Sequence, residues 1–177
     1  RALPATTFAW QNGAPAFFGS TSSRTTALDA GGLCLPMDVN GDGIVDIVYA
    51  RSDGGNLRLD LCLGTPDGTF SEAVPISVTG LKFTPTLLPL DIDADGCTDL
   101  VHGWLDGGQL ALTVFHARQV GDRWTLVQGP AGSAGPPGLP GATLLPVDYD
   151  GDARIDLVHA ASEEGKLVLQ PLRSDGT

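Results

Sequence analysis

The chain of 177 residues has little cysteine, few aromatic residues and no long apolar run. Its three cysteines are too few for a disulfide framework. No apolar segment approaches the length of a membrane span, which argues against a transmembrane helix. Charged runs that favour helices are missing, while 24 glycines and 13 prolines make up about a fifth of the chain. This composition is typical of short strands joined by turns, and it predicts an all-β fold.

The motifs of common catalytic sites are missing as well. The sequence has no Gly-x-Ser-x-Gly elbow, no His-Glu-x-x-His helix, no Cys-x-x-Cys pair and no phosphate-binding loop. Glycosidases use pairs of carboxylates, but eleven of the aspartates belong to the loops described next. His116 has no counterpart in the repeats, so the sequence supports no zinc site around it. We therefore expect a protein that is not an enzyme.

A nine-residue acidic loop occurs three times, at residues 38–46, 91–99 and 148–156. The copies read DVNGDGIVD, DIDADGCTD and DYDGDARID, with an oxygen-bearing side chain at positions 1, 3, 5 and 9. Ca²⁺ takes about six to eight oxygen ligands, which a short loop with alternate carboxylates and one backbone carbonyl can supply. The spacing predicts up to three calcium sites. Their expected ligands are Asp38, Asn40, Asp42, Ile44 and Asp46; Asp91, Asp93, Asp95, Cys97 and Asp99; and Asp148, Asp150, Asp152, Arg154 and Asp156, with Ile44, Cys97 and Arg154 contributing their carbonyls.

Position 6 of each loop makes a sharp turn, which favours glycine because a Cβ is penalised there. Gly43 and Gly96 meet this requirement, whereas the third loop has Ala153. If the third loop keeps the same backbone, this Cβ costs roughly 1 kcal/mol or more, which corresponds to about tenfold in affinity. We therefore expect the third site to be the weakest. The alternative is that all three loops are aspartate-rich surface turns without metal.

The loops also account for the charge of the protein. They contain 11 aspartates, and the formal net charge is −11. An acidic protein usually avoids nucleic acid and anionic membranes. The acidity here is local to the loops, so bound metal would cancel part of it. Without metal the crowded carboxylates repel one another, and calcium is therefore expected to contribute to folding stability.

The loops begin 53 and then 57 residues apart, which is the scale of a propeller blade or a solenoid repeat. An apolar segment precedes each loop (LCLPMD, TLLPLD, TLLPVD), and DIVYA, DLVHG or DLVHA follows it. Alternating strands come next (NLRLDLCLG, QLALTVFHA, KLVLQPL), and hairpin turns then lead to TFSEAVPIS and RWTLVQ. Each repeat thus predicts four strands, with the metal loop joining the first two.

The repeats are offset along the chain. The third repeat stops at RSDGT, before its fourth strand, while residues 5–10 resemble the outer strand of a preceding repeat. In a propeller, this offset lets the N-terminal strand complete the last blade. Three blades are fewer than the typical number of about four to eight. We therefore expect residues 1–177 to be one β-propeller-type domain, part of a longer propeller or, alternatively, of an oligomeric ring.

The pattern D-x-[DN]-x-D-G-x-x-D-[IL]-V, followed about twenty residues later by L-G-x-x-D-G-T-F, resembles the FG-GAP/VCBS repeat family. This family includes the calcium-bearing blades of integrin α-subunit-like propellers. Residues 35–75 match best, residues 88–128 match well, and the third copy departs from the pattern at Ala153. The resemblance implies a propeller fold and calcium binding. Family members serve as adhesion domains, lectins, parts of secreted polysaccharide-active enzymes and propellers of toxin-like proteins, so the fold does not settle the function.

Some repeated positions have two interpretations. Tyr49, His102 and His159 occupy one position of the repeat, where we expect packing between neighbouring blades rather than a ligand surface. Cys34 and Cys62 align with apolar residues of the other copies, so we expect small buried thiols. A bridge between these two cysteines is the alternative.

A few residues are candidates for contact with a partner. Trp104 is the best candidate for stacking on a sugar, while Trp10 and Trp124 are expected to pack between repeats. Residues 129–141 carry glycine at every third position, and we interpret them as a proline-stiffened loop between repeats rather than collagen. This loop and residues 19–32 are long, and long loops often bind partners.

The sequence therefore predicts a calcium-binding, non-enzymatic β-propeller module. We expect it to act in protein interaction or adhesion outside the cell, as part of a larger secreted or toxin-like protein. Its partner is expected to be a protein or a glycan, without nucleic acid and without membrane insertion. The alternatives are a carbohydrate-binding lectin and an accessory domain of a polysaccharide-active enzyme.

Overall fold

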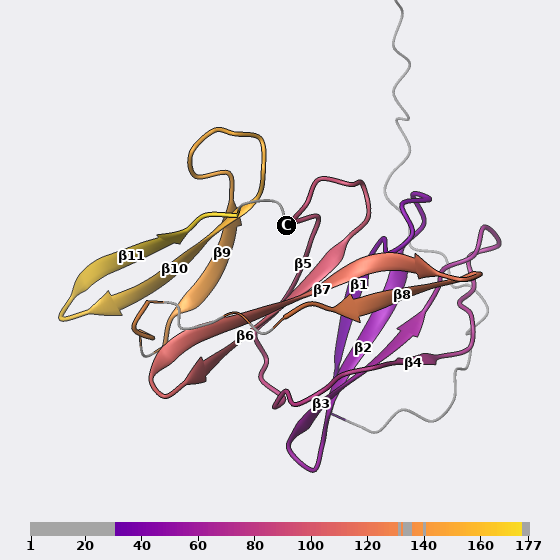
Figure 1. Cartoon of the computed structure of the whole chain (residues 1–177), viewed down its shortest axis with the longest axis horizontal. Coiled ribbons are helices and arrows are strands. Elements are labelled where there is room, and N and C mark those ends of the chain that lie inside the picture. Colours follow the sequence, from indigo (N-terminus) through magenta and orange to yellow (C-terminus); the bar gives the residue numbers. More distant parts are fainter. Residues whose placement is uncertain (1–30, 131, 133–135, 140, 175–177) are drawn as a thin grey trace, which may run out of the picture.

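The computed structural model describes residues 31–130, 132, 136–139 and 141–174. These residues form three antiparallel sheets and no helix, so the described part of the chain has no helix that could span a membrane. Figure 1 shows the second sheet between the first and the third. The all-β prediction is confirmed. The sheets do not close on themselves in the part that is described, and the number of blades in a propeller stays a prediction.

The first two sheets have four strands each, in sequence order, and the third has three. The first sheet contains β1 (Leu33–Met37), β2 (Asp46–Asp53), β3 (Asn56–Cys62) and β4 (Val74–Ile76). The second contains β5 (Leu87–Leu90), β6 (Asp99–Asp106), β7 (Gln109–Val120) and β8 (Arg123–Gln128). The third contains β9 (Thr143–Val147), β10 (Asp156–Glu163) and β11 (Lys166–Leu172). The four-strand repeat is confirmed in the first two copies, whereas the expectations for residues 5–10, Trp10 and most of residues 19–32 fall outside the described residues.

The sheets pack face to face because each strand alternates apolar and polar side chains. In β3, Leu57 and Leu59 point to the face that packs on the second sheet, where Leu100 and Phe115 meet them in the largest core. The opposite face of the second sheet packs on the third through a smaller core. That core consists of Leu90, Val101 and Leu157 with the partly buried Leu88, Ile92, Leu112, Val114, Ile155 and Leu172. The middle sheet is therefore covered on both faces.

The acidic loops join the first two strands of each sheet. The first two loops lie side by side, because the N–H of Thr98 donates to the carbonyl of Asp38 at 2.6 Å. The Asp38 N–H in turn donates to Thr98 Oγ1 at 3.2 Å. Stacking of the sheets thus brings loops that are 53 residues apart in the sequence to one edge of the molecule.

Gly129 and Gly132 lie along the edge of β7, where β8 no longer pairs with it. The N–H groups of Gly129 and Gly132 donate to the carbonyls of Val114 and Leu112 at 2.8 and 2.7 Å. A Cβ on Gly132 would lie 2.8 Å from that Leu112 oxygen, which requires glycine there. The described residues of segment 129–141 form no strand between β8 and β9, in line with the interpretation as a loop between repeats, and residues 131, 133–135 and 140 lie outside the described part. The glycines of this segment allow a close approach that protects the edge of a long strand.

Two predictions about buried side chains have different outcomes. Tyr49, His102 and His159 are all buried, as packing residues would be, while contact of this position with a neighbouring blade stays a prediction for Tyr49. The three cysteines are free, and Cys62 is buried as expected, but Cys34 is exposed. The prediction for Cys34 was wrong because this residue points to the face of β1 opposite the core residue Met37.

Candidate metal centres

The backbone of the three loops turns twice through the left-handed region. At position 6, φ is 80° for Gly43, 87° for Gly96 and 68° for Ala153, so the third loop does keep the backbone of the others. At position 4 the second loop has Ala94 with φ of 59°, where the other loops have glycine. A residue with a Cβ is penalised in this region. The second and third loops therefore each carry one strained alanine, and backbone strain alone does not make the third site the weakest.

The aspartate at position 9 holds each loop against its sheet. Asp46 is completely buried, and its two carboxylate oxygens accept hydrogen bonds from the N–H groups of Val39 at 2.8 Å and Gly64 at 2.7 Å. Asp156 accepts the equivalent bonds from Tyr149 at 3.1 Å and Ser174 at 2.8 Å. One donor comes from loop position 2 and the other from the residues that follow the third strand. Position 9 thus ties the loop to the far end of the hairpin.

The surroundings of this aspartate differ between the sheets. Burial raises the pKa of Asp46, against the effect of its two N–H donors. Burial likewise raises the pKa of Asp99. In the third sheet the hydrogen bond from the Ser174 N–H lowers the pKa of Asp156. The same residue in the same loop therefore meets a stronger desolvation penalty where a further sheet covers it.

The remaining loop carboxylates face the backbone of their own loop. In the first loop, Asp38 accepts hydrogen bonds from the N–H groups of Asp42 and Gly43 at 3.2 and 2.9 Å, and Asp42 accepts from Ile44 at 2.8 Å. The amide of Asn40 donates to Asp42 at 2.8 Å. A carboxylate oxygen has two lone pairs, so these bonds leave capacity for a metal ion. They also hold the loop in shape without one.

The structure brings carboxylates together in the second and third loops. Oxygens of Asp91, Asp93 and Asp95 lie within 4.8 Å of one another, and so do oxygens of Asp148, Asp150 and Asp156. Asp152 is outside the third-loop group. In the first loop Asn40 supplies an amide oxygen at position 3. These acidic groups could hold a metal ion, and their donors are the oxygens that hard cations prefer.

Two arginines reach the loops from the ends of the sheets. The side chain of Arg118 lies across the second loop. It donates to Asp93 Oδ2 at 2.7 Å and to Asp95 Oδ2 at 2.8 Å. In the third loop Arg173 is more exposed and lies 3.4 Å from Asp150. The second loop is therefore the one whose carboxylates at positions 3 and 5 are already paired with a protein cation.

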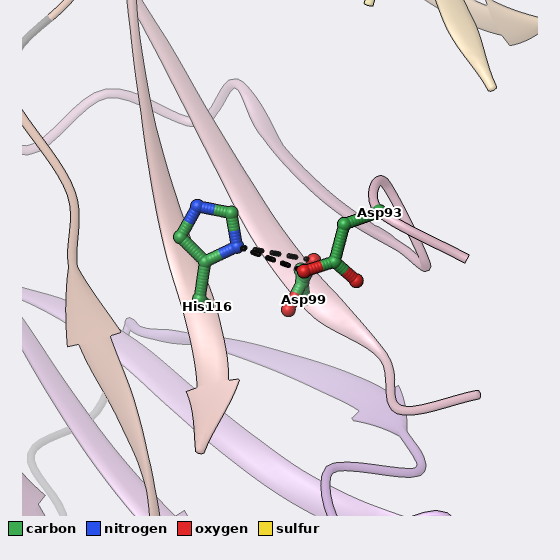
Figure 2. Close-up of side chains that lie close together, drawn as sticks. All are labelled: Asp93, Asp99 and His116. Atoms are coloured by element: carbon green, nitrogen blue, oxygen red, sulfur yellow. Dashed lines mark ion pairs between the residues drawn. The ribbon is translucent and has the colours of Figure 1, made fainter. Parts of the chain in front are cut away.

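His116 also reaches the second loop, as Figure 2 shows, with its ring facing Asp93 and Asp99. Its Nδ1 lies 3.7 Å from Asp93 Oδ2 and 3.5 Å from Asp99 Oδ2. Neither His116 nor Arg118 is predicted by the repeat pattern as a neighbour of this loop. Strand pairing contained the signal, since Leu100 pairs with Phe115 and the same register puts His116 opposite Asp99. Counting back from the Gly107–Gly108 turn would have found this pair.

The sheets and loops define an all-β repeat protein with an acidic loop in each repeat. A family model described as an FG-GAP-like repeat matches residues 38–102, which confirms the resemblance for this part of the chain. The matched part begins at the first loop and ends in β6, after the second loop. No curated protein matches the chain. A β-rich FG-GAP-like repeat fits a module for protein interaction.

Proposed function

We propose that this protein is a calcium-binding, non-enzymatic β-propeller module for protein interaction or adhesion outside the cell, as part of a larger secreted or toxin-like protein. The observation that carries the proposal is the apolar outer face of the third sheet. The acidic loops support it independently, because they supply oxygen donors at the edge of each sheet. No nucleic acid, membrane insertion or catalysis is part of this proposal.

The outer face of the third sheet consists of residues whose counterparts are buried in the other sheets. Leu167 is 71% exposed, whereas Leu110 and Leu57 at the same position of the repeat are 5% and 2% exposed. Leu169 is 55% exposed, while its counterpart Leu59 is 1% exposed. In both other sheets this face is covered by the next sheet. The occupant that we propose is therefore a further sheet of the same repeat, from a longer propeller or, as the alternative, from a second copy of the chain.

Calcium suits the donors of the first and third loops. The first offers the side-chain oxygens of Asp38, Asn40 and Asp42, and the third offers Asp148 and Asp150 with the buried Asp156. When bound, Ca²⁺ would neutralise these crowded carboxylates and join the two ends of each loop. The chain's own contribution is the aspartate at position 9, which fixes the loop to its sheet.

Light scattering with melting curves, in calcium and in EGTA, tests the proposal. We expect a higher melting temperature in calcium, since an ion that binds only the folded chain stabilises it by mass action. Equal melting temperatures in the two buffers would contradict calcium binding. A monomer whose mass is the same in both buffers is expected if a longer chain supplies the next sheet. A multimer that Leu169→Glu converts to monomer would assign the outer face to a second copy instead.

A lectin is the second candidate, and one cavity favours it. The cavity has a volume of about 230 Å³ and lies between the second and third sheets, lined by Trp104, Thr84, Thr86 and His159 among others. One face of Trp104 is already stacked on His102, with ring centroids 5.3 Å apart. Binding on a glycan array that Trp104→Ala abolishes while the variant stays folded would favour the lectin over the interaction module.

A further inference from the structure

The second loop and the adjoining strand β7 contain a group of buried polar atoms without hydrogen-bond partners. They are Asp93 Oδ1, Asp99 Oδ2 and His116 Nδ1, three of the five such side-chain atoms among the described residues. The side chain of Asp99 is completely buried, and those of Asp93 and His116 are 13% and 19% exposed. Buried polar atoms are nearly always satisfied by protein, water or an ion. Three such atoms in one cluster therefore mark a place where an ion or water can bind.

Contacts within the protein do not satisfy these atoms. The distances of 3.5 and 3.7 Å from His116 Nδ1 to the carboxylates are longer than hydrogen bonds to a ring nitrogen. Val39 and Tyr149 donate to the position-9 carboxylate in the other loops. Ile92 is their counterpart in the second loop, and its backbone N–H makes the smallest of the contributions that lower the pKa of Asp99, without a hydrogen bond of normal geometry to Asp99 Oδ2.

The same distances suit ligands of one small ion. Zn²⁺ lies about 2.0–2.2 Å from imidazole nitrogen and carboxylate oxygen, so two ligand atoms in a tetrahedral site are roughly 3.4 Å apart. His116 Nδ1 lies at nearly this separation from Asp99 Oδ2. Oxygen or nitrogen atoms of all three side chains lie within 4.8 Å of one another. An ion can therefore contact the three residues with small movements of the side chains.

The chemistry of the donors distinguishes this group from a calcium loop. Imidazole suits zinc and related transition ions, whereas calcium prefers oxygen donors alone. Two carboxylates and a neutral histidine balance the charge of a divalent ion. Arg118 meanwhile pairs with Asp93 Oδ2 and Asp95 Oδ2, and so leaves Asp93 Oδ1 free. Arg118 is thus a positioning residue that fixes the ligand Asp93 and competes with calcium for Asp95.

We propose that the second loop binds a divalent transition ion, represented by Zn²⁺, through Asp93, Asp99 and His116. Water completes the coordination of the ion. This inference goes beyond calcium binding, because it gives the second loop a different class of metal from the other two. The position opposite the position-9 aspartate makes the difference: it is His116 here, Leu63 in the first sheet and Arg173 in the third.

Isothermal titration of Zn²⁺ into the whole chain, with Ca²⁺ in excess, tests the proposal. We expect one equivalent of Zn²⁺ to bind without being displaced by calcium. The chain has three histidines, so NMR can follow their rings separately. The Nδ1 resonance of His116 should shift in proportion to bound Zn²⁺, while those of His102 and His159 stay unchanged.

His116→Leu is the decisive variant, since it introduces the residue of the first sheet. Loss of an outer partner of a metal ligand costs about 10–100-fold in affinity, so loss of a direct ligand should cost at least on the order of 100-fold. The matched variant Asp106→Asn removes an exposed carboxylate at the other end of β6, away from the loop. It should change Zn²⁺ affinity by less than about threefold, because carboxylates that do not touch the ion act only through screened charge.

Melting curves in chelator show whether each variant folds. No Zn²⁺ binding by the folded wild type, or equal binding by folded His116→Leu, would overturn the proposal. Should His116→Leu fail to fold, an unshifted His116 Nδ1 resonance in the zinc-titrated wild type would overturn it equally. Calcium stabilisation without zinc binding contradicts this inference alone. Zinc binding at His116 without calcium stabilisation contradicts only the calcium proposal.

Discussion

The second and third sheets carry the same sequence pattern but have different surroundings. The second sheet lies between two others, and both of its faces contribute to a core. The third sheet is covered on one face, while Leu167 and Leu169 on the other are mostly exposed. The burial of a repeat position thus depends on the next sheet rather than on the sheet that carries it. An apolar residue at this position marks an interface, whether or not a partner covers it.

The same difference affects the loops. The position-9 aspartate has a raised pKa in the two covered sheets and a lowered one in the third. Desolvation by the next sheet therefore acts on the candidate metal ligands as well as on the apolar residues. Addition of a sheet to the open face of the third repeat would increase the desolvation of Asp156 and so raise its pKa, as in Asp46.

The largest expected effect is on the free energy of unfolding, when the leucine at one repeat position is truncated in the second sheet and, for comparison, in the third. Leu110→Ala should lower the free energy of unfolding by about 2–5 kcal/mol, because it leaves a cavity in a covered interface. Leu167→Ala at the same position should change it by less than about 0.5 kcal/mol, since the side chain is exposed. Denaturant unfolding of both variants measures the difference. A large loss for Leu167→Ala would mean that the outer face is covered in solution.

The next effect is a pH dependence in the covered second sheet. Burial lowers the pKa of His102 to about 4. The Thr84 hydroxyl donates to the Gly103 carbonyl at 2.6 Å, so His102 Nε2, 3.0 Å from it, is the donor and Nδ1 has no partner. The unfolded chain takes up a proton near pH 6.5, which the folded chain resists until about pH 4. Stability should therefore fall as the pH drops through this window, by at most about 3 kcal/mol.

The control for this pH effect is His102→Gln. Denaturant unfolding between pH 7 and pH 4 gives the slope for wild type and variant, and their difference removes the contribution of the carboxylates. The variant should lose the part of the slope that belongs to His102. Identical slopes would show that His102 takes up its proton in the folded state, and thus that the second sheet is less closely covered than the structure indicates.

The smallest effect concerns the strained alanines of the second and third loops. Ala94→Gly and Ala153→Gly should each stabilise the chain in chelator by about 0.5–1 kcal/mol. Relief of the left-handed strain exceeds the added freedom of glycine in the unfolded chain. Gly43 has φ of 80°, and a Cβ there would meet no other atom. Gly43→Ala should therefore destabilise the chain through backbone strain alone. If Ala153→Gly stabilises the chain and Ala94→Gly does not, only the third loop is strained.

Much of the fold could be predicted from local pattern. Alternation in NLRLDLCLG predicted β3, whose buried Leu57, Leu59 and Leu61 all lie on one face. The expected turn at position 6 is confirmed by the positive φ of Gly43. Cys34 was placed wrongly, because alignment with buried residues does not tell which face of an edge strand meets a neighbour.

The candidate site was predicted only where its residues are contiguous. Asp93 and Asp99 belong to one loop, and their spacing alone identified them as possible ligands. His116 and Arg118 reach the loop from β7, and only strand pairing brings them there. A repeat pattern emphasises residues that recur, so it gives little weight to a histidine that occurs in one copy. That single departure from the pattern is what distinguishes the second loop chemically.

The sequence by itself determined the strands, the loops between them and the oxygen donors, since all three depend on the order of side chains over a few residues. Tertiary structure decided which faces are covered, which aspartates are desolvated and which cations reach a loop. Burial and electrostatic interaction depend on distances through space, and a stack of sheets sets those distances between residues far apart in the chain. Leu110 and Leu167 are the same residue in the same pattern, and only the presence of the next sheet separates them.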